Sequence, residues 1–148
     1  MSGVSILLPG PSVVGAGPEG RVCAVNRGIR YVKGQCDIWC CCEKPGPGAF
    51  PEPGTYYRRP KALLTLPIHA NAWLGGAFPV IPANLEPDHW VAPITGRGLL
   101  TSHMVLLSYL IQQGATEINQ YGCDMGGTGY ADDMRDHAPN RPWGFRWR

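Results

Sequence analysis

The stretch 99–125 constrains the fold more than any other part of the chain. Its residues 102–113 form a mostly apolar run that ends at Gly114, as expected of a helix with a glycine stop. The apolar positions go nearly all round this helix, so we expect it to be covered on more than one side. A strand over 116–121 and a Gly-x-Asp turn ending at Asp124 follow. The segment therefore predicts a helix that returns the chain to a sheet.

Other apolar runs predict the remaining strands, at 4–8, 21–25, 37–43 and 61–66. A helix is expected over 27–33. The alternation of strands and helices favours an α/β layered fold with a mainly parallel sheet. Residues 72–98 hold short apolar pieces broken by prolines, which fit either short strands or a covering loop.

Polar residues collect after these strands and at the start of the long helix. In open α/β sheets, ligands bind at the carboxyl ends of the strands. A helix start with small hydroxyl residues can also receive an anion. We therefore expect one edge of the sheet to gather Gly10, Ser12, Asn26, His69, Asn71, Thr101, Ser102, Gly122 and Asp124. Thr101, Ser102 and Asp124 are the predicted lining of a ligand site, and Thr101 or Ser102 is the predicted helix cap.

Two of these signals have an ordinary alternative. Gly10-Pro11-Ser12 gives a ligand close access to the backbone, but it also fits a simple tight turn, and it is not a Walker loop. Asn26 can cap the following helix or present its amide to a base or sugar, and these roles are compatible.

The chain has 20 glycines and 15 prolines among 148 residues, which predicts long Pro/Gly-rich loops, above all over 44–60. Within that stretch, Tyr56 and Tyr57 precede Arg58 and Arg59. This local group either binds a phosphate through its arginines or forms a solvated face.

Six cysteines include the run Cys40-Cys41-Cys42. Adjacent residues on a strand point to opposite faces, and no pair of Cys-x-x-Cys motifs is present, so we do not expect a metal centre there. Buried free cysteines behave as small apolar residues. Magnesium bound through Asp124, Asp132, Asp133 and Asp136 stays open, because carboxylate oxygens suit this cation.

The formal net charge is +2, too small to imply a nucleic-acid partner. A basic, aromatic tail over 139–148 could stack on bases but also fits an amphipathic segment packed on its own domain. The first residues lack the features of a secretion signal, and the long helix is too short to span a bilayer. We expect one cytoplasmic domain over 1–148 with no membrane partner; a homo-oligomer is compatible with the sequence.

Three segments resemble a known superfamily: Leu8 to Ser12, Cys23 to Asn26, and Leu100 to Asp124. They are similar to the small bacterial CMP-sialic acid sialyltransferases and the MptE-like 6-hydroxymethylpterin diphosphokinase domains, which have short phage-encoded relatives. The resemblance implies a Rossmann-like nucleotide-binding domain. The nucleotide site it implies comprises Gly10, Pro11, Ser12, Asn26, Thr101, Ser102, Gly122 and Asp124.

The same resemblance implies a histidine base after the Gly-x-Asp turn, for which His137 is the candidate. Two positions depart from the family pattern: Pro9 replaces its leading Asn, and His103 replaces a Gly and becomes a second candidate base. Asp124 completes the candidate catalytic residues. Arg58 or Arg59 would stabilise the leaving phosphate. The expected function is group transfer from a nucleotide or nucleotide-sugar donor. The alternative is a non-catalytic module, such as a phage protein that sequesters a nucleotide-derived defence signal.

Overall fold

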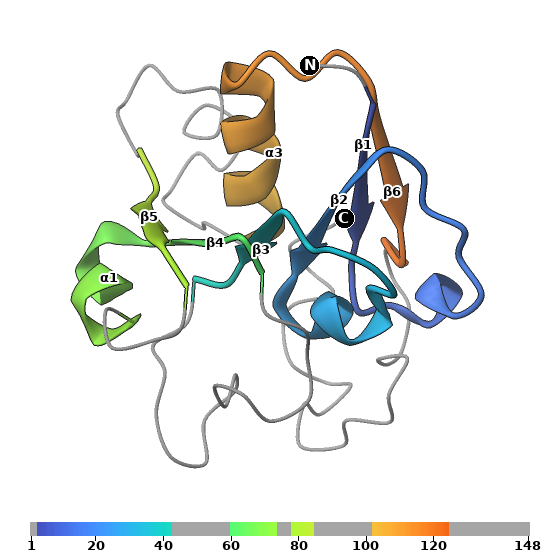
Figure 1. Ribbon diagram of the computed structural model, residues 1–148, viewed down its shortest axis with the longest axis horizontal. Coiled ribbons are helices and arrows are strands. Elements are labelled where there is room, and N and C mark those ends of the chain that lie inside the picture. Colours follow the sequence, from blue (N-terminus) through green and yellow to red (C-terminus); the bar gives the residue numbers. More distant parts are fainter. Residues whose placement is uncertain (1–2, 43–59, 74–77, 85–101, 125–148) are drawn as a thin grey trace.

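The computed structural model describes residues 3–42, 60–73, 78–84 and 102–124. Within them, six strands form one sheet in the order β5-β4-β3-β2-β1-β6, and every neighbouring pair is parallel (Figure 1). The strands are β1 (Val4–Leu7), β2 (Arg21–Val25), β3 (Ile38–Cys40), β4 (Ala62–Thr65), β5 (Val80–Pro82) and β6 (Ile118–Tyr121). The predicted α/β fold with a mainly parallel sheet is confirmed.

The order of the strands contains one reversal. From β1 to β5, each new strand adds to the same side of the sheet, whereas β6 returns to pair with β1 on its other side. After β1, the chain therefore builds β2 to β5 on one side of this strand and then returns to add β6 on the opposite side. In open α/β sheets, ligands bind outside the carboxyl ends of the strands at such a switch point.

The long predicted helix is α3 (Ser102–Gln112). Gly114 follows it with φ of 90°, and the N–H of Ala115 donates to Leu110 O at 3.0 Å, so the predicted glycine stop is confirmed. The helix expected over 27–33 is wrong in type, because the chain forms a 3-10 helix there, η2 (Asn26–Tyr31). A second short 3-10 helix, η1 (Pro11–Val13), follows β1.

Two short elements, α1 and β5, lie where the sequence patterns are weak. Helix α1 (Pro67–Trp73) starts directly after β4, with Pro67 at its first position, where a missing N–H costs nothing. Strand β5 is one of the short strands that the broken apolar pieces of 72–98 allowed. His69 and Asn71 therefore lie on a helix after β4 rather than in a loop.

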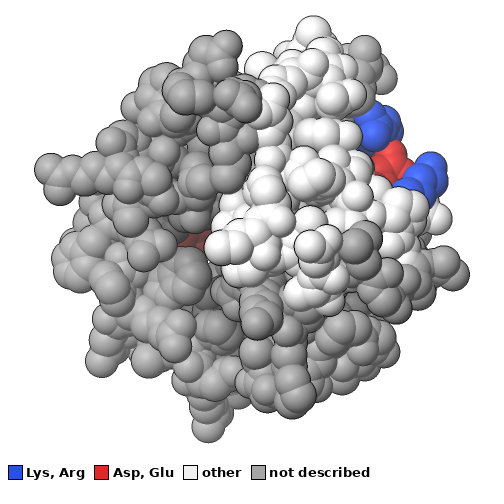
Figure 2. Space-filling view, turned by 90° about the vertical axis from the view of Figure 1, so that its left-hand side faces the viewer, with Lys and Arg blue, Asp and Glu red and all other residues white. Residues whose placement is uncertain are grey.

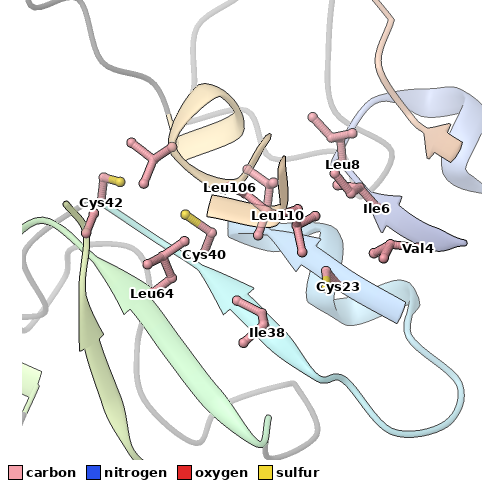
Figure 3. Close-up of a cluster of buried hydrophobic side chains, with 13 residues drawn as sticks. Val4, Ile6, Leu8, Cys23, Ile38, Cys40, Cys42, Leu64, Leu106 and Leu110 are labelled. Carbon is pink, nitrogen blue, oxygen red and sulfur yellow. The ribbon is translucent and has the colours of Figure 1, made fainter. Parts of the chain in front are cut away.

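Helix α3 packs over one face of the sheet, and Figure 3 shows the buried cluster between them. Leu106 and Leu110 of the helix pack against side chains of the inner strands and of the residues just after them, which Figure 3 labels Val4, Ile6, Leu8, Cys23, Ile38, Cys40, Cys42 and Leu64. Burial of this much apolar surface is the main source of stability in such a domain. The cover over the helix itself is incomplete, since Ile111 is 47% exposed.

The opposite face carries a second core under η2 and α1. Trp39 lies at its centre, fully buried, with its ring edge-on to Trp73 at a centroid distance of 5.7 Å. Cys41 belongs to this core, whereas Cys40 and Cys42 belong to the core under α3. The predicted alternation of the cysteines between faces is confirmed.

Figure 2 shows one side of the molecule, on which the described surface is mostly uncharged apart from a group of basic and acidic side chains at its right-hand edge. Within the described parts of the chain, none of the helices has the length and hydropathy needed to cross a bilayer.

Candidate functional site

The ends of β1 and β6 are joined by backbone hydrogen bonds into one structure, the β1–β6 junction (residues 8–14 and 122–124). The N–H of Leu8 donates to Tyr121 O at 2.8 Å, and the N–H of Gly10 donates to Gly122 O at 3.0 Å. Pro11 has no N–H, and the N–H of the following residue, Ser12, donates to Asp124 Oδ2 at 2.9 Å. The two loops therefore continue the ladder of the strands past the sheet, and they place Asp124 beside η1.

Both glycines of the β1–β6 junction are required by close packing. A Cβ on Gly10 would lie 2.3 Å from Gly122 O and from Asp124 Oδ2. Gly122 has φ of 79°, and a Cβ there would lie 2.2 Å from Leu8 O. A side chain at either position would force the loops apart, so these residues act by letting the loops meet. Asp124 itself is exposed at this edge.

Asn26 directly follows β2, which pairs with β1 on the side opposite to β6. It is the one described residue other than glycine with a left-handed backbone, at φ of 49°. The Trp39 indole N–H donates to its carbonyl oxygen at 2.8 Å and holds this conformation. Its carboxamide oxygen is buried and has no hydrogen-bond partner among the described residues. The capping role is wrong: η2 is capped by Val25, and no side chain caps it.

Ser102 lies at the carboxyl edge of the sheet but above β3. Its hydroxyl oxygen accepts a hydrogen bond from the Cys42 N–H at 3.0 Å, and its carbonyl accepts one from the Cys40 thiol at 3.2 Å. These contacts attach the start of α3 to the end of β3. Since β3 and β6 are three strand spacings apart, about 14 Å, Ser102 and Asp124 share the edge without lining the same point. Thr101 lies outside the described residues.

His103 is buried beneath the start of α3, where its Nε2 hydrogen-bonds to Gln120 Oε1 of β6. Burial lowers the pKa of His103 below its usual range, and the bond to Gln120 opposes this only in part. The imidazole is therefore neutral at pH 7. Gln120 was not predicted as a site residue; the period of two along β6, which sets residues 118 and 120 on the α3 face, was the available signal.

Other polar side chains lie farther along the same edge. His69 is in the first turn of α1, and its Nδ1 is hydrogen-bonded to Cys42 O at 2.9 Å. Asn71 is exposed on the same helix. Arg27, directly after Asn26, is 5% exposed and brings a buried positive charge to the start of η2. A single arginine after a strand forms no recognisable pattern, so the sequence does not predict Arg27 as a site residue.

Several predicted residues lie outside the described ranges. These are Arg58 and Arg59, His137, the acidic residues Asp132, Asp133 and Asp136, and the tail 139–148. Of the predicted magnesium ligands, the described part of the chain contains Asp124, and it holds no group of three or more side chains able to bind a metal ion.

No protein-family model, curated protein or solved structure matches this chain.

Proposed function

We propose that the chain is a Rossmann-like nucleotide-binding domain that transfers a glycosyl or diphosphate group from a nucleotide donor. The observation that carries this proposal is the hydrogen bond from Ser12 N–H to Asp124 Oδ2 at the switch point between β1 and β6. It fixes an exposed carboxylate at the place where α/β sheets bind nucleotides. The resemblance to sialyltransferases and pterin diphosphokinases, carried by the same segments, gives the class of reaction.

Residues on three adjacent strand ends support a ligand of nucleotide size. Asp124 follows β6, Ser12 follows β1 and Asn26 follows β2, and these strands are neighbours in the sheet. Two strand spacings, about 10 Å, separate the outer pair.

The transfer reaction needs a base for the acceptor hydroxyl and cations for the leaving phosphate. We assign the base to His137 and the cations to Arg58 or Arg59. His103 is neutral, as a base must be, but it is buried and its Nε2 is bound to Gln120, which makes it the weaker candidate.

A second function, binding without turnover, is favoured by the two described histidines. Both described histidines near the sheet edge, His69 and His103, are already hydrogen-bonded to protein groups. A domain whose edge only holds a nucleotide-derived signal needs no free base. The two functions share the site and differ in the fate of the ligand.

Thermal unfolding against a ligand panel tests both. The panel comprises CMP, CTP, CMP-sialic acid, ATP with and without Mg²⁺, cyclic nucleotides and ADP-ribose. A ligand that binds only the folded chain raises the melting temperature. A shift with product formation that His137→Ala abolishes supports the transferase. A shift with the ligand recovered intact supports the binding module, and no shift with any nucleotide contradicts both.

A further inference from the structure

The first part of the loop after β1, residues 8–14, already uses all of its backbone donors. From Leu8 to Val14, each N–H makes a hydrogen bond within the protein, and the two remaining positions are prolines. The Leu8 N–H donates to Tyr121 O, the Gly10 N–H to Gly122 O and the Ser12 N–H to Asp124 Oδ2. The Val13 N–H donates to Gly10 O, and the Val14 N–H to Pro11 O. A loop that cradles phosphate needs N–H groups pointing at the ligand. Residues 8–14 offer none.

The negative charge at the β1–β6 junction also disfavours a phosphate there. Asp124 places a carboxylate against the loop, with Oδ2 held by Ser12 N–H and the side chain exposed. A phosphate brought to this point would meet a like charge, which costs energy at short range. A hydroxyl or amino group would instead find a fixed acceptor, and hydrogen bonds to a charged acceptor are the strong ones.

Asn26 supplies a second acceptor at the neighbouring strand end. Its Oδ1 is buried and has no hydrogen-bond partner among the described residues, and a buried acceptor without a donor is costly. The left-handed backbone at this residue is held by Trp39, so the side chain is positioned by the core and not by a capping contact.

From these observations we propose that the ends of β2, β1 and β6 bind the nucleoside part of the ligand through its hydroxyl or amino hydrogens and leave the phosphates elsewhere. The inference rests on the proposed function and specifies which half of the nucleotide faces Asp124 and Asn26. The shared chemistry is a neutral hydrogen-bond donor, which ribose hydroxyls and the exocyclic amines of cytosine, adenine and guanine all provide.

Competition calorimetry on the full chain tests the proposal. The probes are CMP, AMP, GMP and UMP, the parent nucleosides, their 2′,3′-dideoxy forms and inorganic pyrophosphate, each in EDTA and in Mg²⁺. Asp124→Asn keeps an oxygen for Ser12 N–H and removes the charge. Asn26→Gly keeps the left-handed backbone and removes the amide. Glu117→Gln, an exposed carboxylate at the amino end of β6, is the matched control.

We expect at least one of Asp124→Asn and Asn26→Gly to weaken nucleoside binding about tenfold, the loss expected for a hydrogen bond to a charged group. Pyrophosphate binding stays unchanged in both variants, with or without Mg²⁺. Loss of affinity for the dideoxy forms identifies the ribose as the donor, and its retention identifies the base. Melting temperatures of the variants check that they fold.

The proposal is overturned if nucleotides bind but nucleoside affinity is unchanged in both variants. It is also overturned if Asp124→Asn weakens pyrophosphate binding in either condition, even if the loss is seen only with Mg²⁺ present. Either result leaves the nucleotide function intact. If no nucleotide or nucleoside binds the wild type, the proposed function fails as well.

Discussion

Asp124 Oδ2 accepts a hydrogen bond from the Ser12 N–H at 2.9 Å, although the two residues are 112 positions apart in the chain. The contact exists because β6 pairs with β1, the first strand, after the chain has built the rest of the sheet on the other side. It joins the two loops and leaves the carboxylate of Asp124 exposed.

The close approach at Gly122 makes this residue sensitive to any side chain. Gly122→Ala should lower the free energy of unfolding by about 2–5 kcal/mol, from left-handed strain and from contact with Leu8 O. Gly15→Ala is the matched control, since Gly15 has the same φ of 79° with no atom within 4 Å of the added Cβ. It should cost only the left-handed strain, about 1–2 kcal/mol. Equal losses in urea denaturation would contradict the packing account.

Thr65, at the end of β4, is fully buried, and its hydroxyl has no hydrogen-bond partner among the described residues. Thr65→Val keeps the shape and removes the unsatisfied group, so it should leave stability unchanged or raise it by about 1 kcal/mol. Ser5→Ala is the comparison, because the Ser5 hydroxyl donates to Glu19 O and accepts from Glu19 N–H. That variant should lose about 1 kcal/mol or more. A comparable loss in Thr65→Val would show that its hydroxyl is bonded.

Burial lowers the pKa of His103, so its protonation opposes folding. The unfolded chain takes up this proton near pH 6.5, and stability should fall as the pH drops through that value, by up to about 1.4 kcal/mol per pH unit. The loss should level off below the folded pKa. His103→Gln should flatten this part of the profile in denaturation experiments at several pH values. If stability changed with pH equally in wild type and in His103→Gln, His103 would have the same pKa in the folded and unfolded chain, contrary to this prediction.

Asp37 lies between Arg21 Nε at 2.7 Å and Lys61 Nζ at 3.2 Å. Burial raises the pKa of this carboxyl group, but its hydrogen bonds to the two cations outweigh this and lower it overall. The stabilisation is therefore present above the unfolded pKa of about 3.9 and is lost as the pH falls through the folded value. Asp37→Asn should be less stable than wild type at pH 7 and equal to it in acid. A constant difference at every pH would contradict the ion pairs.

All six cysteines are free thiols, and five of them are buried. Burial raises the pKa of Cys23 to about 11 and also raises that of Cys40, so neither forms the reactive thiolate at pH 8. Cys123 also has a raised pKa, from burial and from Asp124, but it is only partly buried. A thiol reagent should therefore modify one thiol fast, and Cys123→Ser should remove that phase. Fast modification of several thiols would contradict the buried core.

The sequence predicted the sheet well where local patterns decide structure. The apolar runs located β1, β2 and β4, and Gly114 marked the end of α3, because periodicity and backbone freedom act over a few residues. It failed in type at η2, where no local signal separates a 3-10 helix from an α-helix, and α1 went unassigned because seven residues give little periodicity.

The site was predicted as a set of positions and not as a geometry. Strand ends drew attention to Ser12, Asn26 and Asp124, but the contact between Ser12 and Asp124 depends on the order of strands, which no local pattern contains. Ser102 was expected beside Asp124, yet its hydroxyl faces Cys42 above β3. Gln120 was overlooked because its role comes from His103 on a different element.

The most direct test of the central claim is a two-dimensional amide NMR titration of the chain with CMP and AMP. The account predicts that one of them shifts the amide signals of Gly10, Ser12, Asn26 and Gly122, at the carboxyl ends of β1, β2 and β6. Signals at the amino ends, such as those of Arg21 and Glu117, should stay in place. Shifts confined to the amino ends, or no shift with either nucleotide at millimolar concentration, would contradict a nucleotide site at the β1–β6 junction.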